Sequence, residues 1–345
     1  MILNEKILQF MRTNNGDFNQ LALDVFAYQY ENCLAYQRYC QQLQATVDDI
    51  ELWWQIPSVP TDVFREFDLC TFDPALAKYI FQTSGTTQDS KGKHYYRDLS
   101  LYDEAIKLRF MSGIGLSQEK ITFRMLTPSF DDVSTSSLFY MLQRAMEWYG
   151  DTHSRFYMKN NELDYSQLER DLSADIAEKR PIALIGTAFS LVNFFDHFQN
   201  QHWQLPEGSV LMETGGLKGR AREISQTELY QLFFTRLALT PAQCYSEYGM
   251  TELSSQCYSK PRQDGERSVF ISPHWMPTRI IDPETGDDVA IGEQGIVQFF
   301  DLANLEAISA VMTSDLAIKH EDGFELLGRA PLSVLRGCST QFEKV

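Results

Sequence analysis

One short segment places hydroxyl groups around a single glycine, an arrangement suited to binding phosphate. Its hydroxyl side chains belong to Thr83, Ser84, Thr86 and Thr87. Gly85 lies between them and can adopt backbone angles that other residues avoid, and a turn of that kind points several N–H groups at one anion. The segment predicts a phosphate-binding loop; the alternative is a surface turn, because turns favour the same residue types.

The residues after these hydroxyls support a phosphate site without matching the most familiar nucleotide loop. Lys91 and Lys93 follow closely and add positive charge, but the sequence lacks the Gly-x-x-x-x-Gly-Lys-Ser/Thr pattern. His94 comes next. The six histidines of the chain form no set with the spacing of metal ligands, and we expect His94 to be a solvated loop residue.

Strands and helices alternate through the middle of the chain, and they must position this loop. Buried or alternating apolar runs predict strands at 77–82, 121–127, 181–185 and 209–212. Helical periodicity predicts helices at 101–110, 134–148, 165–179, 191–198 and 225–237. The alternation predicts a layered α/β fold, with sheets flanked by helices. Because ligands in such folds sit beyond the carboxyl ends of strands, we expect the loops at 83–93, 213–219 and 246–252 to share one crevice.

The two ends of the chain differ from this middle part. Residues 1–50 read as helical, whereas short strand-like runs separated by turns begin near residue 268, at 268–272, 278–281, 295–300 and 307–312. We therefore expect four parts: an N-terminal helical segment (1–75), an α/β nucleotide-binding core (76–267), a small β-rich subdomain (268–330) and a C-terminal tail with Cys338 (331–345).

Composition excludes several classes of protein. The 345 residues include 47 acidic and 30 basic side chains, for a net charge of −17. Such a surface repels nucleic acid and anionic membranes, and we expect neither as a partner. No apolar run reaches the roughly 18 residues of a membrane span, and the N-terminus does not resemble a signal peptide. The six cysteines contain no Cys-x-x-Cys pair, which argues against zinc and disulfide scaffolds and favours a reducing cytoplasm.

Five segments, taken together, resemble the adenylate-forming superfamily, which includes acyl-CoA synthetases, luciferases and peptide-synthetase adenylation domains. In chain order they are Thr83-Ser-Gly-Thr-Thr87, Glu213-Thr-Gly-Gly216, Tyr248-Gly-Met-Thr-Glu252, Thr313-Ser-Asp315 and Gly328-Arg329. The chain looks closest to the acyl-protein synthetases, the fatty-acid-activating component of the bacterial bioluminescence reductase complex. Two further segments carry that likeness, Ile56-Pro-Ser-Val-Pro-Thr-Asp-Val-Phe64 and Leu335-Arg-Gly-Cys-Ser339.

The resemblance implies ATP as a cosubstrate, Mg²⁺ as the metal, and a role for each motif residue. The loop residues 83–87 would hold the pyrophosphate end of ATP, Thr251 would donate to the α-phosphate, and Glu252 would position Mg²⁺. The nucleoside would be bound by Tyr248, Gly215, Gly216, Gly249, Asp315 and Arg329. For Tyr248 the alternative is plain core packing, for Glu252 an exposed residue at a helix start, and for Asp315 with Arg329 a surface ion pair.

The resemblance also implies the reaction. A carboxylic acid, in this family a fatty acid, would form acyl-AMP, and the thiolate of Cys338 would take the acyl group for transfer to a partner such as an acyl reductase or a carrier protein. The alternatives are an adenylating ligase that passes an acyl or aryl group to coenzyme A or a carrier protein, and a non-catalytic nucleotide-binding subunit. Cys338 would then be a small apolar residue of the last strand.

Three departures from the superfamily pattern bear on the first step. Gln88 and Ser314 stand where many members have glycine, and only sixteen residues follow Arg329. The mobile C-terminal domain of the superfamily does not fit in that length, nor does its lysine that assists adenylation. Lys91, Lys93 and Lys218 are the candidates to replace that lysine.

Overall fold

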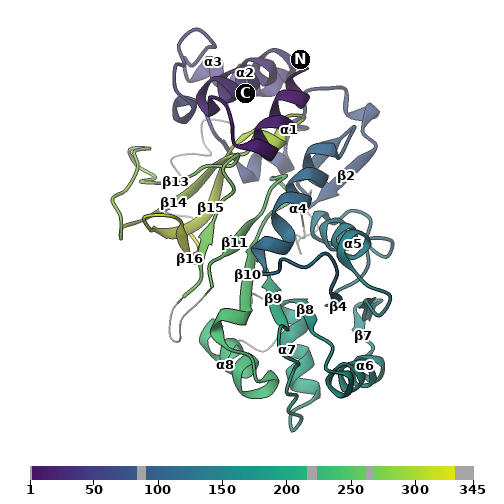
Figure 1. Cartoon of the computed structure of the whole chain (residues 1–345). Helices are drawn as coiled ribbons and strands as arrows, with labels where there is room; N and C mark the ends of the chain where they lie inside the picture. The colour runs from purple at the N-terminus through teal and green to yellow at the C-terminus, as the bar shows by residue number, and fades with distance from the viewer. Residues whose placement is uncertain (1, 84–90, 216–223, 262–266, 331–345) are drawn as a thin grey trace.

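The computed structural model of the chain describes residues 2–83, 91–215, 224–261 and 267–330. One sheet of twelve strands runs through the molecule. Its path is β13-β14-β15-β16-β12-β11-β10-β9-β8-β4-β5, and β1 (Val59–Pro60) pairs with β15 from the side. Figure 1 shows this sheet running from the parallel strands near the bottom of the view to the antiparallel strands above them.

The parallel half of the sheet is the α/β core. It contains β4 (Thr122–Leu126), β5 (Arg155–Phe156), β8 (Ile182–Thr187), β9 (Val210–Thr214) and β10 (Cys244–Tyr248). Except for the short β5, these strands are buried along almost their whole length, because helices cover both faces, as parallel sheets require.

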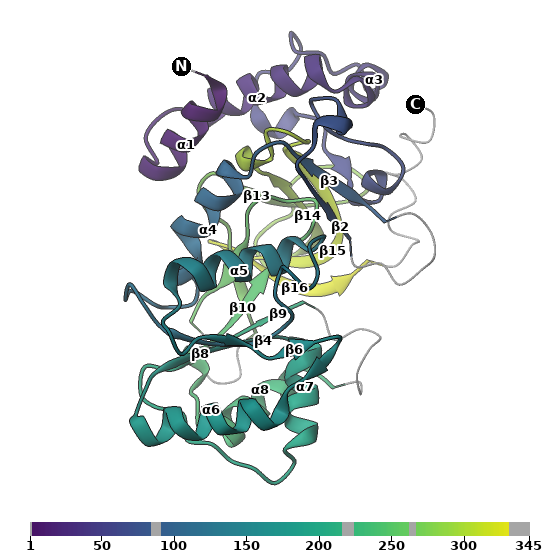
Figure 2. The ribbon, with the colours of Figure 1, turned by 90° about the vertical axis from the view of Figure 1, so that its right-hand side faces the viewer.

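The helices divide cleanly between the two faces of that parallel sheet, as Figure 2 shows. Side chains of α6 (Tyr165–Glu178), α7 (Ala188–His197) and α8 (Gln226–Leu237) share one apolar cluster with the sheet. Side chains of α4 (Ser100–Gly113) and α5 (Ser137–Tyr149) share another cluster with the opposite face. The layered α/β fold predicted from the sequence is therefore confirmed, and each predicted helix and strand of the core appears within a few residues of its expected bounds.

Beyond β10 the same sheet continues as antiparallel strands. They are β11 (Cys257–Ser259), β12 (Val269–Ile271), β13 (Thr278–Ile281), β14 (Gln294–Phe300), β15 (Ala310–Lys319) and β16 (Phe324–Arg329). The strand predicted at 307–312 begins at Ala310 and continues to Lys319, so Asp315 lies within a strand. The β-rich part is joined to the core through β12 and β11; the four-part division of the chain stays a prediction.

Three N-terminal helices pack on the antiparallel half of the sheet. They are α1 (Leu3–Thr13), α2 (Phe18–Asn32) and α3 (Leu34–Gln42), and their apolar side chains belong to one cluster with those of β14 and β15. Buried Gln29 of α2 fixes the contact, because its amide donates to the Asn304 carbonyl at 2.9 Å and to Ser309 Oγ at 3.0 Å.

A separate two-stranded hairpin carries the predicted phosphate loop. Its strands are β2 (Tyr79–Gln82) and β3 (Lys93–Tyr96), which pair antiparallel with Gln82 opposite Lys93. The remaining elements are short: the hairpin of β6 (Met158–Lys159) and β7 (Glu162–Leu163), and 3₁₀ turns at Trp53–Gln55, Thr61–Arg65, Pro74–Leu76, Pro241–Gln243 and Leu302–Asn304.

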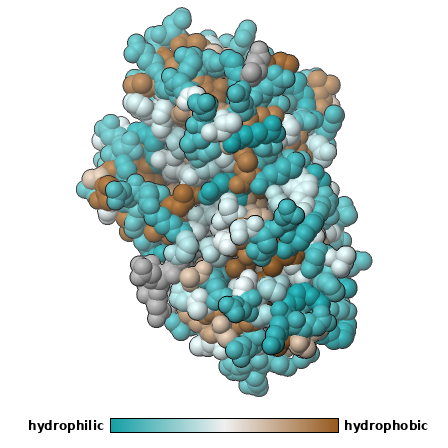
Figure 3. Space-filling view, viewed as in Figure 1, coloured by the Kyte–Doolittle hydropathy of each residue, from teal (hydrophilic) through white to brown (hydrophobic). Residues whose placement is uncertain are grey.

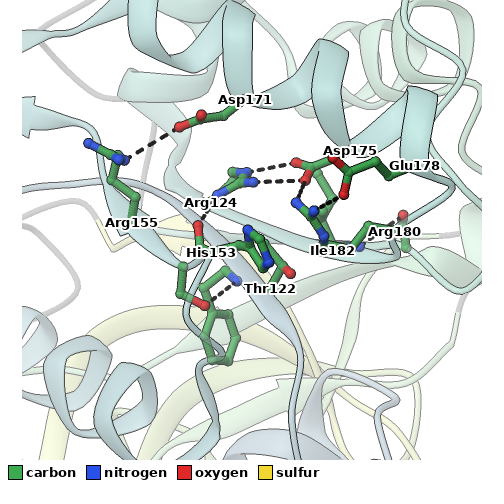
Figure 4. A network of polar contacts seen from close by, with 12 residues as sticks. Thr122, Arg124, His153, Arg155, Asp171, Asp175, Glu178, Arg180 and Ile182 are labelled. Atoms are coloured by element: carbon green, nitrogen blue, oxygen red, sulfur yellow. Dashed lines mark hydrogen bonds and ion pairs between the residues drawn. The ribbon is translucent and has the colours of Figure 1, made fainter.

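A buried ion-pair network fastens α6 to the parallel sheet (Figure 4). Arg124 of β4 makes two bonds to Asp175 of α6, at 2.7 and 2.8 Å, and Arg180 approaches the same carboxylate at 2.7 Å. The side chains of Arg124 and Asp175 are 2% and 0% exposed. A buried charge without its partner is costly, so this network fastens α6 to β4.

The surface agrees with the acidic composition. Figure 3 shows a face on which hydrophilic residues predominate, with apolar residues in small groups between them. Within the four described ranges, no helix is long and apolar enough to cross a membrane.

Candidate active site

The site begins where β10 ends. The structure corrects one expectation here, because residues 246–248 belong to β10 and the loop starts only at Gly249. A Cβ atom on Gly249 would lie 2.5 Å from Oε1 of Glu247 and 3.3 Å from Cγ of Gln256, so a side chain there would require the Glu247 carboxyl group to move. The glycine thus leaves Glu247 in place for its hydrogen bond from Thr214.

The neighbouring strand β9 brings the predicted adenine-contacting segment beside this loop. Thr214, its last residue, is the register partner of Glu247 in the parallel pair, and its hydroxyl donates to Glu247 Oε2. Gly215 follows with a φ of 76°, in the region that favours glycine. Burial, with the nearby charge of Glu213, raises the pKa of Glu247 to about 7.

Tyr248 joins the β10 loop to the antiparallel half of the sheet. Its hydroxyl donates to Asp315 Oδ2 at 2.8 Å, and its ring packs among the phenyl rings of Phe270, Phe299 and Phe324, with centroids 5.8 to 5.9 Å away. The ring is thus part of an aromatic cluster, while its polar end contacts the carboxylate to which the resemblance assigns the ribose hydroxyls.

Asp315 and Arg329 face each other across β15 and β16. They are register partners, and Arg329 Nε lies 4.0 Å from Asp315 Oδ1. The side chain of Arg329 is 73% exposed, so this pair contributes little to stability. Thr313 fixes the strand beside them, because its hydroxyl accepts from the Asp315 N–H at 3.0 Å and donates to the Val297 carbonyl at 2.9 Å.

The base of the predicted phosphate loop is closed by Thr83. Its N–H donates to the Gly92 carbonyl at 3.0 Å, and its hydroxyl accepts from the Gly92 N–H at 3.0 Å. A Cβ atom on Gly92 would lie 3.0 Å from the methyl group of Thr83 and 3.5 Å from Cγ of Arg65. The two ends of the loop are thereby held together, with Arg65 beside them.

His94 ties this hairpin to the β10 loop, and the expectation that it is solvated is wrong. The residue is 1% exposed, and its Nδ1 lies 2.8 Å from the carbonyl oxygen of Thr251. Burial lowers the pKa of the His94 imidazole to about 4. The ring is therefore neutral near pH 7, and the carbonyl partner requires that the proton be on Nδ1.

Glu252 is buried at the end of the same loop. It is 8% exposed and lies in no helix, so the alternative of an exposed residue at a helix start is wrong. Burial raises the pKa of Glu252 to about 7, against the lowering effect of Arg65 and Arg329 and with a raising effect of Asp62. The Glu252 carboxyl group is thus poorly solvated and lies in the field of two arginines.

A buried polar network behind the loop holds residues 252–255 in place. Asn304 donates to the Glu252 carbonyl at 2.8 Å and accepts from Ser254 Oγ at 2.6 Å. Asp301 accepts from the Ser254 N–H at 2.9 Å and from Ser255 Oγ at 2.8 Å. Burial raises the pKa of Asp301 to about 6. A fully bonded buried network of this kind specifies one conformation.

The structure therefore links most of the predicted site residues that it describes. Hydrogen bonds run from Thr83 through the hairpin to His94 and Thr251, and from Tyr248 to Asp315. Glu252 and Arg329 interact electrostatically with each other. Gly215 and Gly249 are brought together because their neighbours Thr214 and Glu247 are hydrogen-bonded. The other predicted residues lie outside the described ranges: Ser84, Gly85, Thr86, Thr87, Gly216, Cys338 and the candidate Lys218.

Four residues that organise this site were not expected from their place in the sequence. Arg65 directly follows the segment 56–64 that resembles acyl-protein synthetases. Its place next to that segment is the one sequence feature that could have indicated a role for Arg65. Glu247, His94 and Asn304 contribute through burial and hydrogen bonds, which only the fold reveals. Among the described residues, Arg65 makes no ion pair with a carboxylate, and its side chain lies beside Gly92 at the base of the predicted phosphate loop.

The donor chemistry fits a magnesium ion that is shared with a nucleotide. Mg²⁺ is usually bound by one or two carboxylates together with phosphate oxygens and water, rather than by a full set of protein ligands. Glu252 supplies one poorly solvated carboxylate, and the described residues contain no group of three or more histidine, cysteine or acidic side chains that could hold a metal without a nucleotide.

Comparison with known proteins agrees with the resemblance drawn from the motifs. Residues 2–345 match the model of a family described as "Acyl-protein synthetase, LuxE". A long-chain-fatty-acid–luciferin-component ligase of Aliivibrio fischeri is 23% identical over 312 residues, which are 88% of this chain and 79% of that protein. The ligase of the same name from Vibrio harveyi is 20% identical over 342 residues, 93% of this chain and 86% of that protein.

Solved structures show the same fold at lower identity. A 2-hydroxyisobutyryl-CoA ligase in an open conformation, with 2-HIB-AMP and CoA, aligns with a TM-score of 0.67 and 14% identity over 90% of this chain and 69% of its own. ATP-bound MatB from Rhodopseudomonas palustris aligns with a TM-score of 0.51 and 14% identity over 76% of this chain and 50% of its own. The fold is that of adenylate-forming enzymes, and the chain belongs to the LuxE acyl-protein synthetase family.

Proposed function

We propose that this protein uses ATP to activate a carboxylic acid, a fatty acid, as acyl-AMP and then transfers the acyl group to the thiol of Cys338. Two contacts support this most: His94, on the hairpin that carries the predicted phosphate loop, bonds to Thr251, and Tyr248 of the same motif as Thr251 bonds to Asp315. Family membership and the names of the two bacterial relatives supply the class of acid.

The first step joins the acid to AMP. A carboxylate oxygen attacks the α-phosphorus of ATP, the new O–P bond forms, and the bond to pyrophosphate breaks. Such a reaction needs its phosphate oxygens held in line and their charge stabilised. In our proposal Thr83, Ser84, Gly85, Thr86 and Thr87 hold the pyrophosphate end, and Thr251 donates to the α-phosphate.

The nucleoside is held on the other side of the β10 loop. Asp315 accepts from the ribose hydroxyls and Arg329 donates to the ribose, while the Tyr248 ring stacks on adenine. Glycines at 215, 216 and 249 let the backbone approach the base closely. The bond from Tyr248 to Asp315 keeps the base-binding ring and the ribose-binding carboxylate at a fixed distance.

Glu252 is the residue that would hold Mg²⁺. The ion, when bound, would neutralise charge on the phosphate oxygens and orient them. Without a cation the buried carboxyl group is driven toward its neutral form, which the raised pKa of Glu252 reflects. Arg65 and Arg329 limit that rise, and Arg65, beside the base of the predicted phosphate loop, adds positive charge where phosphates would lie.

The second step transfers the acyl group. A thiolate attacks the acyl carbon, AMP leaves, and a thioester forms. The thiolate is the reactive form of cysteine, and all five cysteines in the described ranges are buried. Burial raises the pKa of the Cys40 and Cys257 thiols to about 12 and that of Cys70 to about 11. These thiols are poor nucleophiles, which favours Cys338 as the acceptor. The final partner would be an acyl reductase or a carrier protein in the cytoplasm.

Acyl trapping tests this proposal. The purified protein is incubated with ATP, Mg²⁺ and a radiolabelled fatty acid, without coenzyme A, and protein-bound label is measured before and after hydroxylamine. We expect a hydroxylamine-sensitive acyl adduct that is lost in Cys338→Ser and kept in the control Cys70→Ser. An adduct that persists in Cys338→Ser contradicts the role of that cysteine, and acyl transfer that requires coenzyme A favours the alternative ligase.

A further inference from the structure

His94 lies between two parts of the site but has no role in the resemblance that led to the other residues. It is the second residue of β3, directly after the loop that ends with Lys91 and Gly92. Its ring stacks on Tyr96, with centroids 4.3 Å apart and planes at 14°, and lies 6.3 Å from the ring of Phe64. The imidazole is thus held firmly by aromatic neighbours.

Within the described residues, one nitrogen of this ring is hydrogen-bonded and the other is not. Nδ1 is 2.8 Å from the Thr251 carbonyl oxygen and 3.3 Å from the Tyr96 hydroxyl, which itself lies 2.9 Å from Ser254 Oγ. Nε2 is buried, and it has no hydrogen-bond partner among the described residues. Leaving a buried polar atom unpaired costs on the order of 1–3 kcal/mol.

That cost indicates that stability alone does not account for the histidine. A phenylalanine would fill the same stack against Tyr96 without an unpaired nitrogen. What the imidazole adds is the Nδ1–H bond to Thr251, the residue whose own hydroxyl is assigned to the α-phosphate and which precedes Glu252. An unpaired buried polar group in a native structure needs an explanation, and the contact of Nδ1 with Thr251 is a reason to keep a histidine at this position.

We infer that His94 is a positioning residue: through Nδ1–H it holds the Thr251 carbonyl and so aligns Thr251 and Glu252 with the phosphate loop that β3 carries. The inference rests on the proposed function for the meaning of that alignment. The Thr251 backbone is held from the hairpin side by His94, and the next carbonyl, of Glu252, is held by Asn304. The loop is fixed between the two.

Two isosteric substitutions separate this positioning role from a purely structural one. In Asn the amide nitrogen occupies the place of Nδ1, and in Gln it occupies that of Nε2. We expect His94→Asn to keep the bond to Thr251 and to retain the turnover number for carboxylate-dependent ATP–pyrophosphate exchange within about threefold. We expect His94→Gln to lower that number by roughly 10-fold to 100-fold, with the KM for ATP changed less than about threefold, because alignment rather than affinity is lost.

Thermal unfolding and ¹⁵N NMR spectra distinguish a positioning role of His94 from a structural one. Thermal unfolding of both variants is measured, since a merely structural role would make the loss of turnover follow the loss of stability in both. Equal losses in the two variants, or a larger loss in Asn than in Gln, overturn the inference. In ¹⁵N spectra of histidine-labelled wild type we expect a neutral ring protonated on Nδ1 between pH 5 and 8, whose signal shifts when ATP and Mg²⁺ are added.

The spectra also separate this inference from the proposed function. A wild type that exchanges no pyrophosphate but still shows the ATP-dependent shift of His94 contradicts the proposed reaction and leaves the positioning role supported. A ring protonated on Nε2, or a His94 signal that ATP does not change, contradicts the positioning role whatever the enzyme turns over.

Discussion

Two buried glutamates at the end of β10 determine much of the electrostatics of the site. Glu247 and Glu252 both have a pKa raised to about 7 by burial. Their surroundings differ, however. Glu247 accepts from Thr214 and lies near the charge of Glu213, whereas Glu252 lies near Arg65 and Arg329. We propose Glu252 for the metal because the resemblance gives it that role, and the positive charges near its carboxylate would suit the phosphate oxygens that share the ion.

The raised pKa of Glu247 predicts a pH-dependent stability. The folded protein holds this proton up to a pH of about 7, whereas the unfolded chain releases it near the ordinary value of 4.5. The folded state binds more protons between these limits, so the contribution of Glu247 to the free energy of unfolding is full below pH 4.5 and is lost as the pH rises toward 7. Glu247→Gln should remove this loss.

Chemical denaturation of the wild type and of Glu247→Gln from pH 5 to pH 7.5 measures this pH-dependent loss of stability. The free energy of unfolding of Glu247→Gln should gain on that of the wild type by roughly 1–3 kcal/mol across this range. Asp301 titrates in the same direction, but it is present in both proteins and cancels in the difference. A difference that is constant with pH would contradict a raised pKa at Glu247.

The bond from Tyr248 to Asp315 predicts an effect on nucleotide binding. Tyr248→Phe keeps the aromatic cluster and removes the hydrogen bond that holds the Asp315 carboxylate in one orientation, so part of the Asp315 contribution to ATP binding should be lost. We expect the Kd for ATP, measured calorimetrically, to rise on the order of tenfold, which corresponds to about 1.4 kcal/mol of binding free energy. Tyr157→Phe is the matched control, because it removes a similar 2.7 Å bond to Asp171, away from the site. Equal ATP affinity in Tyr248→Phe and the control would contradict the assignment of Asp315 to the nucleotide.

At the scale of elements, α6 shows how the parallel sheet is held rigid behind the site. Arg124, Asp175 and Arg180 form a buried cluster, and Asp175→Asn would leave the Arg124 charge buried without a charged partner. We expect a loss of about 3–5 kcal/mol in the free energy of unfolding. Urea unfolding measures the loss.

The same helix offers the control for that prediction. Glu178 also pairs with Arg180, but its side chain is 59% exposed, and exposed pairs contribute at most about 1 kcal/mol. Glu178→Gln should therefore cost far less than Asp175→Asn. Similar losses in the two variants would mean that the buried network does not fasten α6.

The elements themselves were largely predictable from the sequence. Helical periodicity predicted α6 and α8, and buried apolar runs predicted β4, β8 and β9. The spacing of apolar residues in each element follows from which of its faces pack against other elements. The prediction erred at β10 and β15, where polar motif residues continue a strand. Asp315 looks like a loop residue by type, and Tyr248 directly precedes Gly249, but pairing with β9, β11, β14 and β16 keeps their strands extended.

The site was predictable as a list of motifs but not as an arrangement. Five segments occur in the same order as the nucleotide-binding motifs of a known superfamily, and this order indicated that they bind one nucleotide. The contacts that join them depend on tertiary packing. His94 follows a polar loop and so reads as solvated, yet β3 inserts it between Tyr96 and Phe64. Asn304 is separated from Glu252 by about fifty residues of chain, and nothing local connects them.

At the scale of the whole molecule, one sheet joins the parallel core to the antiparallel strands. Gly215 follows β9, the Tyr248 motif begins at the end of β10, and Asp315 with Arg329 lies on β15 and β16, so a single twisted sheet carries every motif except the phosphate loop. The β2–β3 hairpin carries that loop and is tied to the β10 loop by His94. We therefore expect the motifs to act on one ATP molecule.

Carboxylate-dependent exchange of labelled pyrophosphate into ATP is the most direct measure of that claim, with a panel of acids from acetate to long-chain fatty acids and a set of aromatic acids. We predict exchange that requires Mg²⁺, is greatest with fatty acids, survives in Cys338→Ser, and falls on the order of 100-fold or more in Glu252→Gln. Absence of exchange with every acid in the panel, from a wild-type protein that binds ATP, would contradict the account.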